Sequence, residues 1–399
     1  MKRRGFPQVP FPHSGLGPFQ IFRHESEFLF GWSGRIPHDD LLRAYGAALV
    51  EGCEIFSVHL RRSLPRPPIR VNVFEISSVL PGASGAFTYL DEEDSPVICL
   101  PCGSSNKPTL VERDAAVALA YHELTHVFNW SQRNPRLPDS QPWLWLDEAL
   151  ALLIEAKFRG ASSSLHSHAN SVNAFSLNDP RSEELATLFT SFLEFQVDGG
   201  LEAVFRLFDA GTIYRDPMEA IGEGDFMSGF HSFAKAAFFK PGIFERNLAP
   251  IRDAIVPEAV VWLGSGIVGQ TFSGVLDHLS FHWYDCHVDP GSARELVIRL
   301  TSKEHSKLMA SAIPVEVGED AFIKAGREYH LFGDDAPDLE PLAIPLCDTD
   351  GEPLVRIFFV ISNCGTRGDE QISRAGDGRG YLLVEHDDDV RYDLTVELR

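Results

Sequence analysis

The 399-residue sequence lacks several features that mark specialised classes of protein. Its six cysteines are spread widely along the chain, which is not the spacing of a disulfide framework. The basic residues at 2–4 are followed by Gly and Pro rather than by the apolar segment of a secretion signal. The longest apolar stretch, around 254–269, is interrupted by Pro257, Glu258 and several glycines, and is too short to span a bilayer. We therefore expect a cytoplasmic protein by default, without a membrane span, and leave export by a non-classical route open.

Basic residues are also scarce, with 35 Lys and Arg against 57 Asp and Glu, which gives a formal net charge of −22. This balance argues against nucleic acid and anionic membrane surfaces as partners. The apolar content of 44% and the charged content of 23% are typical of a soluble globular protein. The length indicates two or three domains, and nothing in the sequence indicates an oligomeric state.

Cys99 and Cys102 form a single C-x-x-C on a predicted strand and turn. A second pair of ligands is missing, so the pattern favours structural cysteines over a redox or metal role.

The most informative segment is 122–126, which reads His-Glu-Leu-Thr-His. Two histidines four residues apart lie on one face of a helix, where both imidazoles can reach a single metal ion. Glu123 stands beside that ion and could take a proton from a bound water molecule. Neutral imidazole suits zinc, and this spacing is the H-E-x-x-H signature of zinc peptidases.

The residues around this segment predict a helix that holds both histidines in its interior. Thr109 and Glu112 form a T-x-x-E capping box, and the apolar pattern continues to about Trp130. The dipeptide at 134–135, Asn-Pro, then ends the helix. The relative positions of the two histidines are therefore fixed by the helix.

A second helix is predicted over 143–158, with Gly160 as its C-terminal cap. It is almost wholly apolar and should be buried, yet it carries Asp147, Glu148 and Glu155. A carboxylate buried in apolar surroundings needs a partner, and a metal ion with its histidine ligands would be one. Glu148 and Glu155 are seven residues apart and share a helix face.

Residues 145–151, Trp-Leu-Asp-Glu-Ala-Leu-Ala, resemble the second motif of the gluzincin metallopeptidases, a clan with thermolysin-like and aminopeptidase-like members. In that clan the pattern W-L-N/D-E-G/A-x-A follows H-E-x-x-H by roughly twenty residues, as Glu148 follows His126 here. The resemblance extends over about 70–245. Asp147 is the alternative to Glu148 as a ligand, and the motif favours Glu148.

The resemblance implies a zinc-dependent peptidase that acts on a peptide or protein substrate and binds one Zn²⁺ per chain. Its implied zinc ligands are His122, His126 and Glu148. Glu123 would be the general base, and Glu155 would be the acid that orients a ligand histidine. The metzincin class, which has a third histidine six residues after the second, is excluded because position 132 is Gln.

One part of the gluzincin pattern is not matched. The residue that stabilises the oxyanion is usually a Tyr or His, and the best match to its motif, at 226–229, has Phe in place of Tyr. His231 and Tyr214 are the alternatives, of which we favour His231. The amino-terminus-binding segment Gly-x-Met-Glu-Asn is absent, which favours endopeptidase over aminopeptidase activity. A weak or inactive pseudopeptidase that serves as a zinc-containing binding or scaffold protein is the alternative function.

The periodicity along the chain predicts an α+β zincin-like catalytic unit followed by an all-β sandwich. The catalytic unit would comprise a small mixed sheet and a helix within 1–108 and a mostly helical part over 109–250, and the sandwich would occupy 265–399. The helices outside the motifs are predicted at 39–60, 183–196, 201–208 and 226–239. The strands are predicted within 19–30 and at 69–76, 87–90, 97–100, 279–283, 296–300, 355–361 and 392–398.

Overall fold

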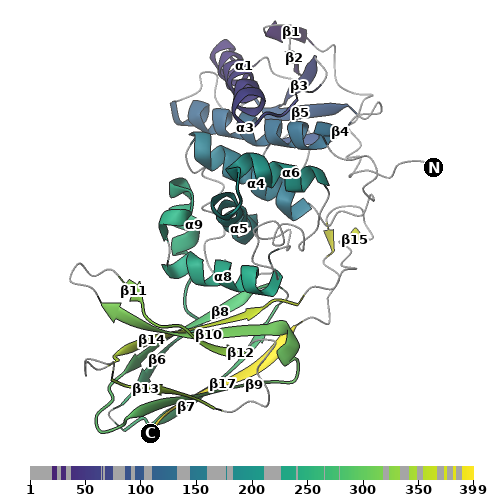
Figure 1. Cartoon of the computed structure of the whole chain (residues 1–399). Coiled ribbons are helices and arrows are strands. Elements are labelled where there is room, and N and C mark those ends of the chain that lie inside the picture. Colours follow the sequence, from purple (N-terminus) through teal and green to yellow (C-terminus); the bar gives the residue numbers. More distant parts are fainter. Residues whose placement is uncertain are drawn as a thin grey trace.

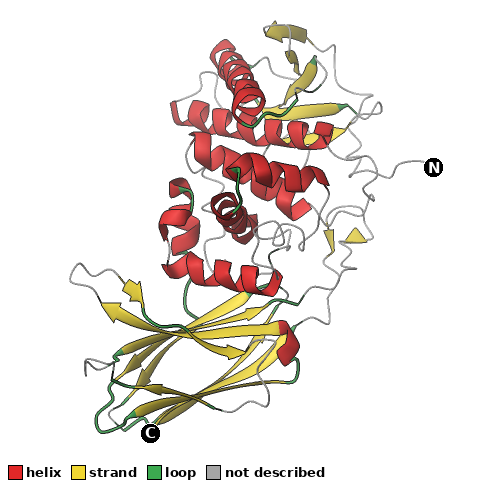
Figure 2. Cartoon of the chain, in the orientation of Figure 1, coloured by secondary structure: helices red, strands yellow, loops and turns green. Residues whose placement is uncertain are grey.

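The chain is a mixed α/β protein in which a helical body stands on a β-rich C-terminal region (Figure 1). The computed structural model describes residues 20–24, 28–32, 37–63, 65, 68–74, 86–90, 95–102, 110–132, 144–159, 177, 183–210, 226–239, 241–264, 266–277, 279–317, 323–332, 341–347, 354–365, 373–374, 381–382 and 389–399. The predicted helix cap Thr109 and the alternative oxyanion residue Tyr214 lie outside these residues. Figure 2 shows that the C-terminal region consists mainly of strands, whereas the N-terminal part combines helices with a sheet.

The N-terminal strands form one five-stranded sheet in the order β1-β2-β3-β5-β4. The strands are β1 (Gln20–His24), β2 (Phe28–Trp32), β3 (Ile69–Phe74), β4 (Phe87–Leu90) and β5 (Pro96–Pro101). The central strands β2, β3 and β5 are parallel, whereas β1 and β4 are antiparallel to their neighbours. The expected mixed sheet is therefore confirmed, and β4 lies at its edge.

The helices within the described residues agree closely with the apolar periodicity of the sequence. They are α1 (Asp39–Glu54), α3 (Leu110–Gln132), α4 (Leu144–Arg159), α5 (Glu183–Gln196), α6 (Gly200–Ala210), α8 (Phe226–Phe239) and α9 (Ala249–Asp253). A π-helical turn, Ile55–His59, continues α1, and two short 3-10 turns, Pro241–Ile243 and Arg246–Leu248, follow α8.

Helix α3 lies between the sheet and α4, so its residues are buried on several sides (Figure 1). Helix α1 approaches α3 at Gly52, where a Cβ atom would lie 2.6 Å from Leu124 Cδ2. A larger residue at this position would therefore require the Leu124 side chain to move. Beyond this point the rings of Phe56 and Phe128 stack with their centroids 4.2 Å apart. The position of α3 is thus set by close packing immediately beside the His-Glu-Leu-Thr-His segment.

The C-terminal region consists of two larger sheets that pack face to face, as in a β-sandwich. The six-stranded sheet has the order β11-β10-β14-β8-β6, with β12 also paired to β10, and the four-stranded sheet has the order β13-β9-β17-β7. Their strands are β6 (Ala259–Leu263), β7 (Gly269–Leu276), β8 (Phe281–Val288), β9 (Glu295–Ser302), β10 (Leu308–Val317), β11 (Ile323–Ala325), β12 (Tyr329–Phe332), β13 (Leu342–Pro345), β14 (Arg356–Asn363) and β17 (Val390–Leu398). A separate pair, β15 (Ser373–Arg374) and β16 (Tyr381–Leu382), lies apart from both.

Strands begin at Ala259, which is earlier than the predicted start of the sandwich at 265. The sequence prediction lacks eight of the C-terminal strands, namely β6, β7, β10, β11, β12, β13, β15 and β16. The inner faces of the two large sheets supply a continuous apolar core that includes Leu276, Phe359 and Leu394.

Helix α8 joins the helical body to the six-stranded sheet. The ring of Phe238 packs edge-on against Trp283 at 4.5 Å and lies 4.4 Å from the ring of Phe358. Phe230 and Phe281 belong to the same apolar cluster, so one hydrophobic core continues from the helices into the sheet. Within the described residues, no helix is long and apolar enough to cross a membrane.

Candidate metal centre

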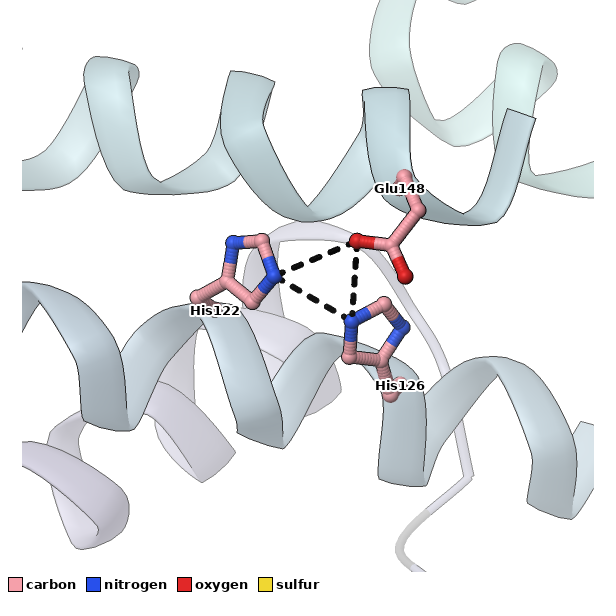
Figure 3. A group of neighbouring side chains, drawn as sticks. All are labelled: His122, His126 and Glu148. Carbon is pink, nitrogen blue, oxygen red and sulfur yellow. Dashed lines mark hydrogen bonds and ion pairs between the residues drawn. The ribbon is translucent and has the colours of Figure 1, made fainter. Parts of the chain in front are cut away.

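The structure brings His122, His126 and Glu148 together between helices α3 and α4, which pack against each other (Figure 3). Both histidines lie in the interior of α3, and Glu148 lies near the start of α4. Their side chains point into the space between the two helices. His122 Nε2 lies 3.2 Å from His126 Nε2, and these nitrogens lie 3.4 and 3.5 Å from Glu148 Oε2.

These three distances fit a tetrahedral zinc site. With zinc–ligand bonds of about 2.0–2.1 Å, two ligand atoms of a tetrahedron lie about 3.3 Å apart. The observed separations of 3.2, 3.4 and 3.5 Å are close to that value on all three edges. The donor set of two imidazoles and one carboxylate is one that zinc accepts, and it leaves a fourth position for water or substrate. His122, His126 and Glu148 therefore fit the metal that the sequence implies.

Each histidine has a carboxylate behind it. Glu155 Oε2 lies 3.4 Å from His122 Nδ1, and Asp147 Oδ2 lies 3.0 Å from His126 Nδ1. Both carboxylates are 1% exposed. An acid at Nδ1 leaves Nε2 available as a ligand atom and fixes the orientation of the ring. The structure thus places Glu155 where the resemblance implies it, beside a ligand histidine.

Asp147 is a member of the site whose role the sequence did not reveal. Its Oδ1 accepts a hydrogen bond from Asn129 Nδ2 at 2.7 Å, and its Oδ2 accepts one from Trp130 Nε1 at 2.9 Å. These donors hold the carboxylate against His126, on a different face of α4 from Glu148. The sequence feature that could have indicated this role is a second acid, next to Glu148, in a helix that is otherwise almost wholly apolar.

Glu123 is 2% exposed and lies beside the cluster on α3. Thr88 Oγ1, on strand β4, donates a hydrogen bond to Glu123 Oε2 at 2.7 Å. Burial raises the pKa of Glu123, whereas the nearby histidines and the Thr88 hydroxyl lower it. The general-base candidate is therefore held by the edge strand of the N-terminal sheet, a contact that the sequence did not suggest.

The cluster is built to hold positive charge. Burial lowers the pKa of His122, but its contacts with Glu148 and Glu155 outweigh that effect and raise the pKa to about 10. Burial raises the pKa of the Glu148 carboxyl, and the two histidines more than reverse this and hold it well below its usual range. Without a metal, protons would supply the positive charge; a divalent cation would displace them.

His231 lies elsewhere in the fold. It is 1% exposed on α8, with Ser362 Oγ 2.9 Å from Nδ1 and Ser311 Oγ 2.8 Å from Nε2. Helices α4 and α5 stand between α8 and α3 (Figure 1). The structure therefore does not bring His231 together with the three candidate ligands, because docking of α8 on strands β10 and β14 commits both ring nitrogens to serine hydroxyls.

Cys99 and Cys102 are both buried at the end of β5. Burial raises the pKa of the Cys99 thiol well above its usual value, which disfavours the reactive thiolate. The geometry agrees with the structural role favoured by the sequence.

No family model matches the chain, and no curated protein matches it. Partial likenesses to solved structures include the pre-peptidase C-terminal domain of a collagenase from Bacillus anthracis, at 14% identity over 36% of this chain and 98% of that chain, with a TM-score of 0.21. The PliG periplasmic inhibitor of g-type lysozyme from Aeromonas hydrophila is 10% identical over 36% of this chain and 100% of that chain, with a TM-score of 0.20. PliG from Salmonella Typhimurium is 11% identical over 35% of this chain and 98% of that chain, with a TM-score of 0.16. Scores this low carry no argument about fold or function.

Proposed function

We propose that the chain is a zinc-dependent peptidase of the gluzincin type that cleaves peptide bonds within polypeptides. The observation that carries this proposal is the convergence of His122 Nε2, His126 Nε2 and Glu148 Oε2 at tetrahedral separations, with Glu123 beside them. Two motifs that are separate in the sequence and lie on two different helices thus meet between α3 and α4. In this proposal the five-stranded sheet, α3 and α4 form the zincin-like catalytic unit.

A zinc ion bound there would polarise the substrate carbonyl and lower the pKa of a water molecule toward neutrality. Glu123 would take a proton from that water as its oxygen forms a bond with the carbonyl carbon. As the carbon–nitrogen bond breaks, Glu123 would pass the proton to the leaving amine. The products are a carboxylate and an amine, and the base returns to its charged form.

The edge strand β4 suits an extended substrate. It pairs with β5 on one side and ends the order of the five-stranded sheet in the described part of the chain. An extended peptide can add to such an edge through main-chain hydrogen bonds. Because Thr88 of the same strand holds Glu123, a peptide on β4 would lie next to the base. A peptide that adds to this edge would be held by residues within its length, which supports endopeptidase activity, the preference that the missing Gly-x-Met-Glu-Asn segment indicates.

Metal analysis of the purified protein tests the site. We expect one zinc per chain by mass spectrometry, and loss of that zinc in His122→Ala and in Glu148→Ala. The matched control is His330→Ala, which removes a histidine whose side chain is 63% exposed. Full zinc content in the two cluster variants would refute the site.

Cleavage of casein tests the reaction. Removal of a general base typically costs about 10²–10⁴ in rate, and we expect a loss of this size in Glu123→Gln with zinc retained. Glu54→Gln, at an exposed position on α1, is the control. Casein cleavage that is unchanged in Glu123→Gln would remove the proposed mechanism.

The second candidate function is a zinc-containing pseudopeptidase that binds polypeptides without cleaving them. The engagement of both His231 nitrogens by serine hydroxyls favours it, since His231 was the preferred oxyanion donor. A protein that holds zinc yet leaves casein and a peptide library intact would establish this alternative.

A further inference from the structure

The exposed apolar side chains of the protein are concentrated at one edge of the β-rich region. Nine large apolar residues are exposed in the described part of the chain, and six of them flank or belong to strand β6. These six are Val256, Val260, Trp262, Ile267, Val268 and Val355. Single exposed apolar residues need no explanation, but a contiguous group on a stable fold indicates a binding surface.

Strand β6 is an edge with unpaired backbone groups. It is parallel to β8 and ends the order of the six-stranded sheet within the described residues. The Asp289 N–H donates to Leu263 O at 2.9 Å. In a parallel ladder, alternate residues of a strand bond the same neighbour, so Leu263, Val261 and Ala259 bond β8. Val260 and Trp262 consequently direct their N–H and C=O groups away from the sheet.

This edge lacks the usual protection against pairing. Natural edge strands carry Lys, Pro or inward charges that discourage another chain, as β13 does with Pro345. Residues 259–263 of β6 read Ala-Val-Val-Trp-Leu, with neither charge nor proline. The exposed fractions of Val260 and Trp262 are 53% and 62%, so the side chains beside the unpaired backbone are apolar as well.

A hollow of about 680 Å³ adjoins the edge and would receive a side chain of the added strand. Its lining includes Trp262, Ile267, His287, Asp289 and Arg356. The indole of Trp262 stacks on the imidazole of His287 at 4.2 Å, which makes one flat wall.

The polar groups at the edge favour a partner with basic ends. Arg356 donates to both carboxylate oxygens of Asp285, at 2.8 and 2.7 Å, so its charge is neutralised. An acidic residue therefore remains at each end of the edge. Glu258, which is half exposed, immediately precedes β6, and Asp289 lies at the far end. Two copies of this chain would bring these acids together, and each copy has a net charge of −22.

We infer that β6 is a docking edge for an extended segment of another protein, with an apolar centre and basic flanks, that adds to the six-stranded sheet as a new strand. Main-chain hydrogen bonds to Val260 and Trp262 would provide affinity, and the hollow beside Trp262 would select an apolar side chain. This surface is separate from the candidate metal centre and does not depend on its activity.

The test measures fluorescence polarisation of a labelled seven-residue peptide in which threonine alternates with valine and phenylalanine between two terminal lysines. The full chain carries Glu123→Gln in every sample, so that the candidate metal site keeps its zinc and cleavage cannot contribute. Val260→Pro removes only an outward N–H, which an edge strand tolerates, and Val260→Thr keeps both the N–H and the shape. Trp262→Ala is matched by Phe195→Ala, which truncates an aromatic residue that is 59% exposed elsewhere.

We expect Val260→Pro and Trp262→Ala each to weaken binding by about tenfold, the effect of losing one or two good contacts. Val260→Thr and Phe195→Ala should bind as the parent does. If Val260→Pro fails to fold, a peptide N-methylated at alternate residues takes its place and should also bind about tenfold more weakly. The inference would be overturned if both edge variants bound the peptide as tightly as the parent does, or if the parent bound the N-methylated peptide as tightly as the unmodified one. So would a dimer in sedimentation that becomes monomeric in Trp262→Ala, because the occupant would then be a second copy of the chain.

Discussion

The histidine pair between α3 and α4 and the single buried histidine of α8 differ in what surrounds them. Between α3 and α4, the nitrogens of His122 and His126 face carboxylates and each other. On α8, the nitrogens of His231 face the hydroxyls of Ser311 and Ser362. Carboxylates raise the pKa of His122 to about 10, whereas burial lowers that of His231 to about 3.

The groups around a buried histidine, and not the residue type, therefore distinguish a candidate metal site from a structural contact. Imidazoles that are surrounded by carboxylates attract a cation. In the pair between α3 and α4, the Nε2 atoms of the two histidines face each other and the carboxylate of Glu148. The His231 network is closed: Ser311 donates to Glu328 Oε1 at 2.5 Å, and Lys235 pairs with the same carboxylate at 2.7 Å. Every polar atom of that imidazole already has a partner, so the network joins two parts of the fold.

The largest effect that we expect is the loss of stability on removal of the His231 side chain. His231→Ala leaves the buried Ser362 hydroxyl without its acceptor and opens a cavity between α8 and the sheet. We expect the free energy of unfolding to fall by about 3 kcal/mol, measured by urea denaturation, with zinc content unchanged. A variant of normal stability that loses only kcat would show instead that His231 acts in catalysis.

Asp147 should affect metal affinity. Asp147→Asn keeps the shape of the side chain but removes the negative charge behind His126, and such changes typically weaken metal binding about 10–100-fold. Competition with a chromogenic zinc chelator would measure the affinity. Asp285→Asn, which alters a buried acid paired with Arg356 in the β-rich region, is the control and should leave the zinc affinity as it was. Equal affinity in both variants would break the contrast between the two regions.

Thr88 should affect the reaction more than the metal. Thr88→Val removes the hydroxyl that orients Glu123, and loss of one such hydrogen bond corresponds to about a tenfold decrease in kcat. Zinc content should not change. Thr190→Val removes a buried hydroxyl on α5 that bonds only its own helix, at Ala186 O, and serves as the control. A fall in zinc content or stability that is as large as the fall in kcat would mean that Thr88 is structural.

The smallest effect concerns pH. In the folded chain burial and Lys235 lower the pKa of His231, His330 lowers it further, and Glu328 opposes them. The unfolded chain, with a pKa near 6.5, binds a proton first as the pH falls, so His231 contributes stability above that pH and loses it below. We expect the parent to lose about 1 kcal/mol more than His231→Gln between pH 7 and 5.5. Parallel stability curves over this range, from thermal unfolding, would contradict a neutral buried His231.

The sequence predicts elements that depend on local pattern and fails where distant segments decide. Helices α3 and α4 follow from apolar periodicity and breakers, and the spacing of His122 and His126 needs only a helix. The choice between Asp147 and Glu148 is different, because neighbouring helical residues point in different directions. Only the packing of α4 on α3 decides which acid meets the Nε2 atoms of the histidines and which one lies behind His126 at Nδ1. For the same reason a pattern within α8 could not show that His231 faces strands more than 70 residues away, at Ser311 and Ser362.

Strands β6 and β7 were missed for local reasons. Strand β6 lies in an apolar stretch with flanking glycines, and β7 is rich in glycine and polar residues. Gly274 in β7 is explained only by Tyr392 across the ladder, whose ring lies 2.4 Å from where a Cβ would be. Such a pairing of a small and a large residue on different strands leaves no periodic signal in the segment that carries the glycine.

The three candidate ligands belong to two helices, and an ion held by all three would tie α3 to α4. His122 and His126 lie on one side of the tie, and Glu148 lies on the other. Since the unfolded chain cannot hold them together, each tenfold rise in free metal above saturation would add about 1.4 kcal/mol to the free energy of unfolding. The amount of folded protein in a cell would then follow the local supply of the metal, and scarcity of the metal would expose the chain to proteolysis.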